Sequence, residues 1–187
     1  MQKTDSQSIL LRKQVKYELM MQEGTYEYTD RDRNVRIVED IRKAIDKMVC
    51  GITPSAKHIA EVVIATNENL QIRDFILGME CEKDIEDIKN YISIFLNVVA
   101  KEKVVPLATI FCKYLYQTNS ISFAKKYLDS ILEQQPDYNL AKLMKSAFNQ
   151  GWSPEVFINI SKDLHTKTLH LIYELDKGDK TEYDNSN

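Results

Sequence analysis

The chain has few of the residues that make turns. Its 187 residues include only five Gly and four Pro. An all-β sandwich needs turn residues at short, regular intervals, so this composition excludes that class. Long segments instead carry apolar residues three and four positions apart, which is the spacing of an amphipathic helix. We therefore expect an all-α protein.

Cysteine is also scarce, and long apolar runs are lacking. Cys50, Cys81 and Cys112 are odd in number and show no CxxC spacing, so we expect reduced, mostly buried thiols. No apolar run approaches the roughly 20 residues needed to cross a bilayer. The first residues lack the apolar core of a secretory signal. These features predict a cytoplasmic protein with no membrane partner.

The charge is nearly balanced. The net charge of −3 is too small to indicate a partner. No cluster of Lys and Arg exceeds what a solvated helix normally carries, so the sequence does not support nucleic-acid binding. Apolar residues make up 43% of the chain, which is enough for a sizeable core. One compact domain is therefore expected.

The chain divides into three segments. Residues 1–31 predict an N-terminal helix and an extended linker, residues 32–175 a helical-hairpin domain, and residues 176–187 a disordered polar tail. In the first helix, basic residues are interleaved with Leu11, Val15 and Leu19. Two interpretations stay open for it: a basic helix that binds a surface, or an ordinary packing helix with lysines at its rim.

The centre of the chain predicts a helical hairpin. Residues 104–117 and 123–132 each carry one apolar stripe, and Asn119-Ser120 interrupts the pattern between them. Pro136 ends the second stripe. The positions that set the spacing are Ala108, Phe111, Cys112, Leu115, Ala124, Leu128, Ile131 and Pro136. This spacing resembles one tetratricopeptide unit, in which small residues such as Cys112 and Ala124 let two helices approach closely.

A broader resemblance covers residues 34–168. It rests on Ile72-Arg73-Asp74, on Leu140-Ala141-Lys142-Leu143, on Gly151 and on Ser153-Pro154-Glu155. These places are similar to the C-terminal helical part of a bacterial family catalogued as domain of unknown function 4192. Together the two resemblances imply an irregular stack of about eight or nine helices in antiparallel hairpins, tetratricopeptide-like in part.

The tetratricopeptide resemblance also implies a binding surface, because the first helix of such a hairpin lines the concave side. Transferring that register makes a set of polar residues exposed on the inner side. They are Thr109, Lys113, Tyr116, Gln117, Asn139, Lys142, Lys145 and Asn149. Such a surface suits an acidic protein or peptide. The equal alternative is that its lysines only keep a helix solvated.

No catalytic or metal-binding motif is expected. His165 and His170 are five apart on a helix, and so cannot readily share a metal. Arg73 and Asp74 form the sharpest charged pair. Because adjacent side chains diverge on a helix, we expect each to reach a different partner. The pair is either a helix-packing device or a functional base and anion clamp.

An acidic run follows at residues 80–87. It lacks the Gly of a calcium loop, so we expect a solvated helix start. The sequence therefore favours a noncatalytic helical scaffold, a protein-interaction module without a cofactor. The alternative is a small regulatory protein that binds nucleic acid or a nucleic-acid enzyme. The oligomeric state and the pathway stay open.

Overall fold

The computed structural model describes residues 2–27 and 29–173, with side chains from Ser6 onward. Within these ranges the chain forms nine α-helices and no strand, so the all-α prediction is confirmed. The helices are α1 (Gln2–Gln22), α2 (Arg31–Val49), α3 (Ala56–Glu68), α4 (Leu70–Leu77), α5 (Ile85–Val98), α6 (Val105–Gln117), α7 (Ile121–Gln134), α8 (Asn139–Asn149) and α9 (Pro154–Tyr173). Two short 3₁₀ helices, η1 (Met79–Cys81) and η2 (Lys101–Lys103), flank α5. The predicted tail at residues 176–187 lies outside the described residues.

Side-chain caps begin several of these helices. The carboxylate of Asp84 accepts a hydrogen bond from the Glu86 N–H at 2.8 Å at the start of α5. At the start of α3, the Ser55 hydroxyl accepts one from the His58 N–H at 3.2 Å. Each bond satisfies a backbone donor that has no partner within the helix.

The predicted hairpin is present as α6 and α7. Asn119 adopts a left-handed conformation with a φ of 62°, which Asn tolerates better than most residues. The chain then reverses, and the Ser120 N–H donates to the Leu115 carbonyl at 2.9 Å. Cys112 and Ala124 are fully buried, as small residues at a close helix contact should be. Whether the hairpin is tetratricopeptide-like stays a prediction.

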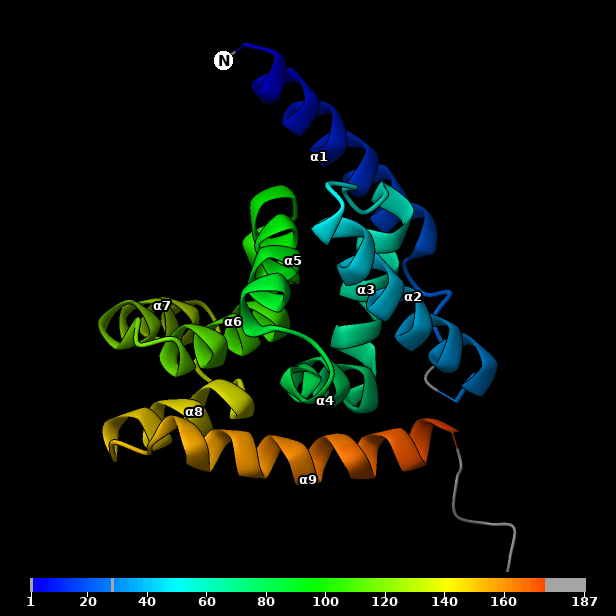
Figure 1. Ribbon diagram of the computed structural model, residues 1–187. Coiled ribbons are helices and arrows are strands. Elements are labelled where there is room, and N and C mark those ends of the chain that lie inside the picture. The colour runs from blue at the N-terminus through cyan, green and yellow to red at the C-terminus, as the bar shows by residue number, and fades with distance from the viewer. Residues whose placement is uncertain (1, 28, 174–187) are drawn as a thin grey trace, which may run out of the picture.

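The helix α6 is the centre of the fold. It contacts α3, α4, α5, α7, α8 and α9. In Figure 1, α9 runs across the base of the molecule beneath α8 and α4, and its contacts reach back to α2. The helix α1 packs on α3 and α5, while its first half projects away from the other helices. The core therefore lies around α6 and is closed from below by α9.

None of the described helices is both long enough and apolar enough to cross a membrane.

Candidate functional site

The predicted binding surface is only partly exposed. Thr109, Lys113 and Tyr116 are buried, and Gln117 is half-buried, so the prediction that they line an open surface is wrong. The reason is the position of α6. In a tetratricopeptide hairpin one side of the first helix is free, but here α4 and α9 cover that side. These four residues therefore belong to the interior.

The second half of the predicted surface lies on α8. Asn139, Lys142, Lys145 and Asn149 are exposed there. The ammonium group of Lys142 lies 2.9 Å from Asp137 Oδ1, and that of Lys145 lies 2.7 Å from Asp129 Oδ1. Exposed ion pairs of this kind contribute about 0–1 kcal/mol and exchange readily with other charged groups.

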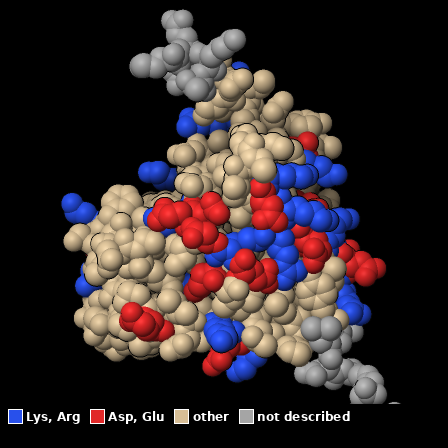
Figure 2. All heavy atoms as spheres, in the orientation of Figure 1, with Lys and Arg blue, Asp and Glu red and all other residues tan. Residues whose placement is uncertain are grey.

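The surface charges are mixed in sign. On the face shown in Figure 2, Lys and Arg side chains lie next to Asp and Glu side chains across the middle and the right of the molecule. The described residues form no unbroken basic stripe on this face. A nucleic-acid backbone is normally met by such a stripe, so this face does not favour the nucleic-acid alternative.

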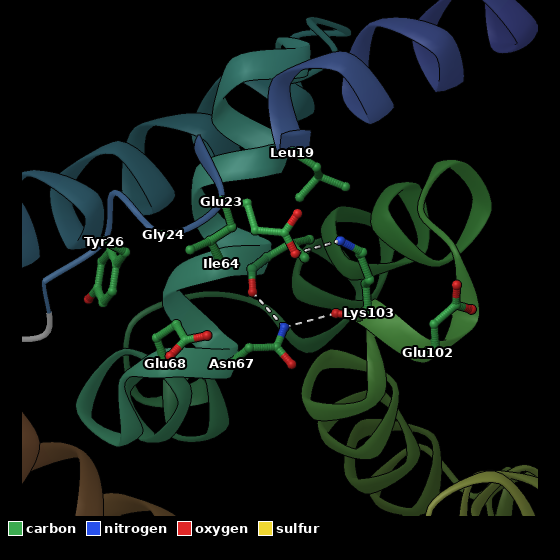
Figure 3. A pocket seen from close by; sticks show the side chains of 10 residues that line it. Leu19, Glu23, Gly24, Tyr26, Ile64, Asn67, Glu68, Glu102 and Lys103 are labelled. Carbon is green, nitrogen blue, oxygen red and sulfur yellow. Dashed lines mark hydrogen bonds and ion pairs between the residues drawn. The ribbon is translucent and has the colours of Figure 1, made fainter. Parts of the chain in front are cut away.

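A hollow of about 340 Å³ lies where α1, α3 and η2 meet (Figure 3). Two of its polar side chains, Asn67 and Lys103, join these elements. The Asn67 side chain donates to the carbonyl oxygens of Val63 and Lys103 at 2.7 and 2.8 Å. The Lys103 ammonium lies 3.4 Å from the Glu23 carboxylate. The contacts of Lys103 with Asn67 and Glu23 therefore hold η2 against α3 and α1.

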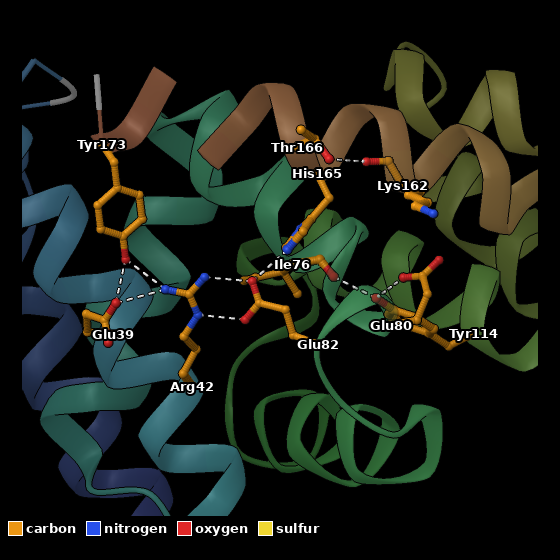
Figure 4. Close-up of polar contacts among 10 residues, drawn as sticks. All are labelled: Glu39, Arg42, Ile76, Glu80, Glu82, Tyr114, Lys162, His165, Thr166 and Tyr173. Atoms are coloured by element: carbon orange, nitrogen blue, oxygen red, sulfur yellow. Dashed lines mark hydrogen bonds and ion pairs between the residues drawn. The ribbon is translucent and has the colours of Figure 1, made fainter. Parts of the chain in front are cut away.

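The most buried charges form a cluster around Lys113, of which Figure 4 shows Glu80 and Tyr114. The Lys113 cluster comprises Leu77, Glu80, Lys113 and Tyr114. Lys113 Nζ forms an ion pair with Glu80 and donates to the Leu77 carbonyl at 2.6 Å. The Tyr114 hydroxyl donates to Glu80 Oε2 at 2.9 Å. The side chains of Lys113 and Glu80 are only 1% and 4% exposed. The cluster therefore ties α6 to the end of α4 and to η1.

A second charged cluster lies beside the first one in Figure 4. The Arg42 cluster comprises Glu39, Arg42, Glu82, His165 and Tyr173. The Arg42 guanidinium makes two hydrogen bonds of 2.6 Å to the Glu82 carboxylate. His165 Nε2 lies 2.8 Å from the same carboxylate. Arg42 also donates to the Tyr173 hydroxyl at 2.7 Å. These contacts fasten α9 to α2 and to the segment after η1.

The pKa values of the two clusters follow from burial and pairing. Burial lowers the pKa of Lys113 to about 8, although Glu80 opposes this change. Burial raises the pKa of Glu82, but the hydrogen bonds from Arg42 and His165 outweigh it, and the net pKa is lowered. Each group is thus matched to a fixed internal partner.

The prediction that residues 80–87 form a solvated helix start is only partly right. Asp84 caps α5 as expected for a helix start. Glu80 and Glu82 do not lie in a solvated helix start, because they pair with Lys113 and with Arg42. Sequence reasoning missed both clusters, because the contacts that join different helices in them link residues between 33 and 134 positions apart in the chain.

Arg73 and Asp74 pair with each other. Arg73 Nε and Nη2 both donate to Asp74 Oδ1, at 2.8 and 2.7 Å. The expectation that each reaches a different partner is wrong, because the Arg side chain is long enough for its guanidinium to reach the carboxylate of the adjacent residue. The pair is partly buried and lies next to Tyr138. Burial raises the pKa of Tyr138, although Arg73 opposes this change. The choice between a packing and a functional pair stays open.

The remaining candidates for chemistry are scattered. Cys112 is buried as expected, but Cys50 and Cys81 are exposed, which corrects the prediction for those two. The described part of the chain contains no group of three or more His, Cys, Asp and Glu placed to hold a metal ion. The two histidines of α9 are both engaged in other contacts.

Comparison of the chain with protein-family models, curated proteins and solved structures gives no match.

Proposed function

We propose that the chain is a noncatalytic helical scaffold that binds another protein. The observation that supports this most is the Lys113–Glu80 pair. It is the most buried ionisable pair described above, and both partners are nearly closed to solvent. A catalytic group must lie within hydrogen-bond reach of a substrate proton. Lys113 and Glu80 reach each other and their neighbouring helices instead, which is a structural use of charge.

The outer face of α8 is the proposed contact with the partner. Here we define that face as Asn139, Lys142, Leu143, Lys145 and Asn149. Leu143, at 68%, is one of the most exposed large apolar side chains among the residues that the structure describes. The two lysines are exposed, and each pairs with an exposed aspartate. An acidic partner would replace these aspartates at little cost, and it would cover Leu143 at the same time.

Affinity purification from the cell of origin tests this proposal. The tagged chain should copurify with a specific protein partner, and purified partner should bind it directly. Lys142→Glu combined with Lys145→Glu should then reduce affinity at least about tenfold, or about 1.4 kcal/mol. The matched control is Lys101→Glu combined with Lys126→Glu, which changes the net charge equally at exposed positions on η2 and α7.

Two results would contradict the proposal. A chain that recovers no protein partner is not an interaction scaffold. A partner that binds both double variants with equal affinity contacts a face other than α8.

A further inference from the structure

The helix α1 carries apolar side chains on two opposite sides. Val15 and Leu19 are buried where α1 packs on α3 and α5. On the opposite side, large apolar side chains are between 52% and 67% exposed. They are Ile9, Leu10, Tyr17, Met20 and Met21. An ordinary surface helix has one apolar stripe and one polar face, so the outer stripe of α1 requires a separate explanation.

The outer stripe has the spacing of a coiled-coil seam. Leu10 and Tyr17 are one heptad apart, and so are Lys13 and Met20. Together the four positions alternate in steps of three and four residues. This is the a and d pattern by which two helices pack side by side. The stripe is therefore shaped for another helix.

The positions of the stripe, though not its residue types, are symmetric along the helix. With Val15 as the midpoint, Leu10 is the counterpart of Met20, and Lys13 is the counterpart of Tyr17. When a second copy is laid in the opposite direction, these positions place Leu10 opposite Met20 and Lys13 opposite Tyr17. Two-fold symmetric dimers need this kind of self-complementary surface.

We propose that two copies of the chain associate through the outer stripes of α1, packed antiparallel. In each half of the seam, Leu10 packs on Met20 of the second copy, and Lys13 lies over the ring of Tyr17 of the second copy. Ile9 and Met21 flank this seam, again as mutual counterparts. This inference concerns a second copy of the chain, and it is independent of any other partner of the scaffold.

The position of Lys13 favours a second copy of the chain over a lipid surface as the partner of this stripe. A lipid surface takes an apolar stripe with lysines at its margins, whereas Lys13 lies inside the stripe, one turn from both Ile9 and Tyr17. In the antiparallel pair, the Lys13 ammonium meets the face of a Tyr ring, which attracts a cation. Figure 1 shows that the first half of α1 projects clear of the other helices. In the second half, which packs on α3 and α5, Tyr17 and Met20 are still 61% and 67% exposed, so the second copy can reach them.

The seam is short. From Ile9 to Met21 it runs about 18 Å, so it covers less than the roughly 800 Å² per partner of a standard interface. We expect a reversible dimer that dissociates on dilution into the micromolar range.

Cysteine trapping in the full chain tests the direction of packing. The background carries Cys50→Ser and Cys81→Ser, because these two native cysteines are exposed. An antiparallel seam brings position 10 next to position 20 of the second copy. A mixture of the Leu10→Cys and Met20→Cys proteins should therefore form disulfide dimers at least about tenfold faster than either protein alone. Trapping of the Leu10→Cys protein with itself would show parallel packing and would overturn the proposal.

Charge exchange at position 17 tests the register. Tyr17→Glu should keep the dimer, because the new carboxylate faces Lys13 of the second copy. Tyr17→Lys should weaken it at least about tenfold. Adding Lys13→Glu to Tyr17→Lys should restore it. Sedimentation equilibrium measures each dissociation constant, and Lys126→Glu on α7 is the control for an unrelated change of charge.

Two further outcomes would overturn the proposal. One is a chain that stays monomeric at every concentration. The other is a monomeric chain that binds vesicles of phosphatidylglycerol through α1, with binding lost in Leu10→Ser. Circular dichroism checks that each variant keeps its helices.

Discussion

Gly78 and His165 touch so closely that no side chain fits between them. A Cβ atom on Gly78 would lie 2.6 Å from Cβ of His165 and 3.0 Å from the Ser161 carbonyl oxygen. The φ of Gly78 is −99°, which any residue adopts, so space and not backbone conformation requires a glycine here. The contact lets the end of α4 lie directly against α9.

Gly78→Ala should therefore separate α9 from α4. We expect a loss of about 1–3 kcal/mol in the free energy of unfolding, because an added methyl group overpacks the contact. Urea unfolding measures the loss, and hydrogen exchange should show α9 amides becoming less protected. Gly24→Ala is the control, since its added methyl group meets no atom within 4 Å and strains only the backbone. Unchanged protection of α9 in Gly78→Ala would contradict the prediction.

The Lys113–Glu80 pair should show strong coupling. Either Lys113→Met or Glu80→Gln alone leaves a buried charge without its counterpart, which costs about 3–5 kcal/mol. The double variant should lose clearly less than the sum of the two, because neither charge then remains. Urea unfolding of the native chain, the two single variants and the double variant measures this coupling. Additive losses would mean that the two groups do not interact in solution.

Stability should rise with pH near pH 8 because of Lys113. Its pKa falls from 10.5 in the unfolded chain to about 8 in the folded protein. Between these values the unfolded chain holds a proton that the folded protein has released, so raising the pH favours folding. Below about pH 8 both states hold the proton, and this dependence disappears.

The measurement compares the native chain with Lys113→Met between pH 8 and 9. The native chain should gain stability relative to the variant, by at most about 1.4 kcal/mol per pH unit. Burial raises the pKa of Cys112 to about 12, which makes stability fall above pH 9. Because both proteins contain Cys112, that effect cancels in the difference. A difference that is constant with pH would show that Lys113 keeps an ordinary pKa.

Ala124 should tolerate no larger residue. It is fully buried where α7 packs on α6, so Ala124→Leu should cost about 1–3 kcal/mol through overpacking. Lys126→Leu is the control on the exposed side of α7 and should change stability by less than about 0.5 kcal/mol. Thermal and urea unfolding give both values. Equal stability of the two variants would place Ala124 away from the contact.

The helices could be predicted from the sequence because their causes are local. The apolar spacing of residues 104–117 and 123–132 and the break at Asn119-Ser120 predict α6 and α7, and both helices are present. A helix depends on residues three and four positions apart. The clusters depend on residues from distant helices, and no spacing rule joins Arg42 to Glu82 or to Tyr173.

One signal for the burial of Lys113 was present in the sequence. Between Val105 and Tyr116 it is the only charged residue. A helix that is apolar on all sides is normally buried, so its single charge requires a buried counterpart. The tetratricopeptide register instead assigned Lys113 to an open surface. The dense apolar content of the helix was the better guide, because burial depends on how many neighbours a helix packs against.

The packing of α9 on α2 and α4 has a consequence for synthesis on the ribosome. Residues of α2 leave the ribosome more than a hundred residues before their α9 partners, since Arg42 and Tyr173 are 131 positions apart. Until α9 emerges, Phe75 lacks the His165 ring that stacks on it at 5.2 Å. The surfaces of α2 and α4 that α9 covers then stay exposed. The helix α9 can therefore pack on α2 and α4 only after residues 154–173 have left the ribosome. Nascent chains stalled before α9 should be held by chaperones that bind exposed apolar surface.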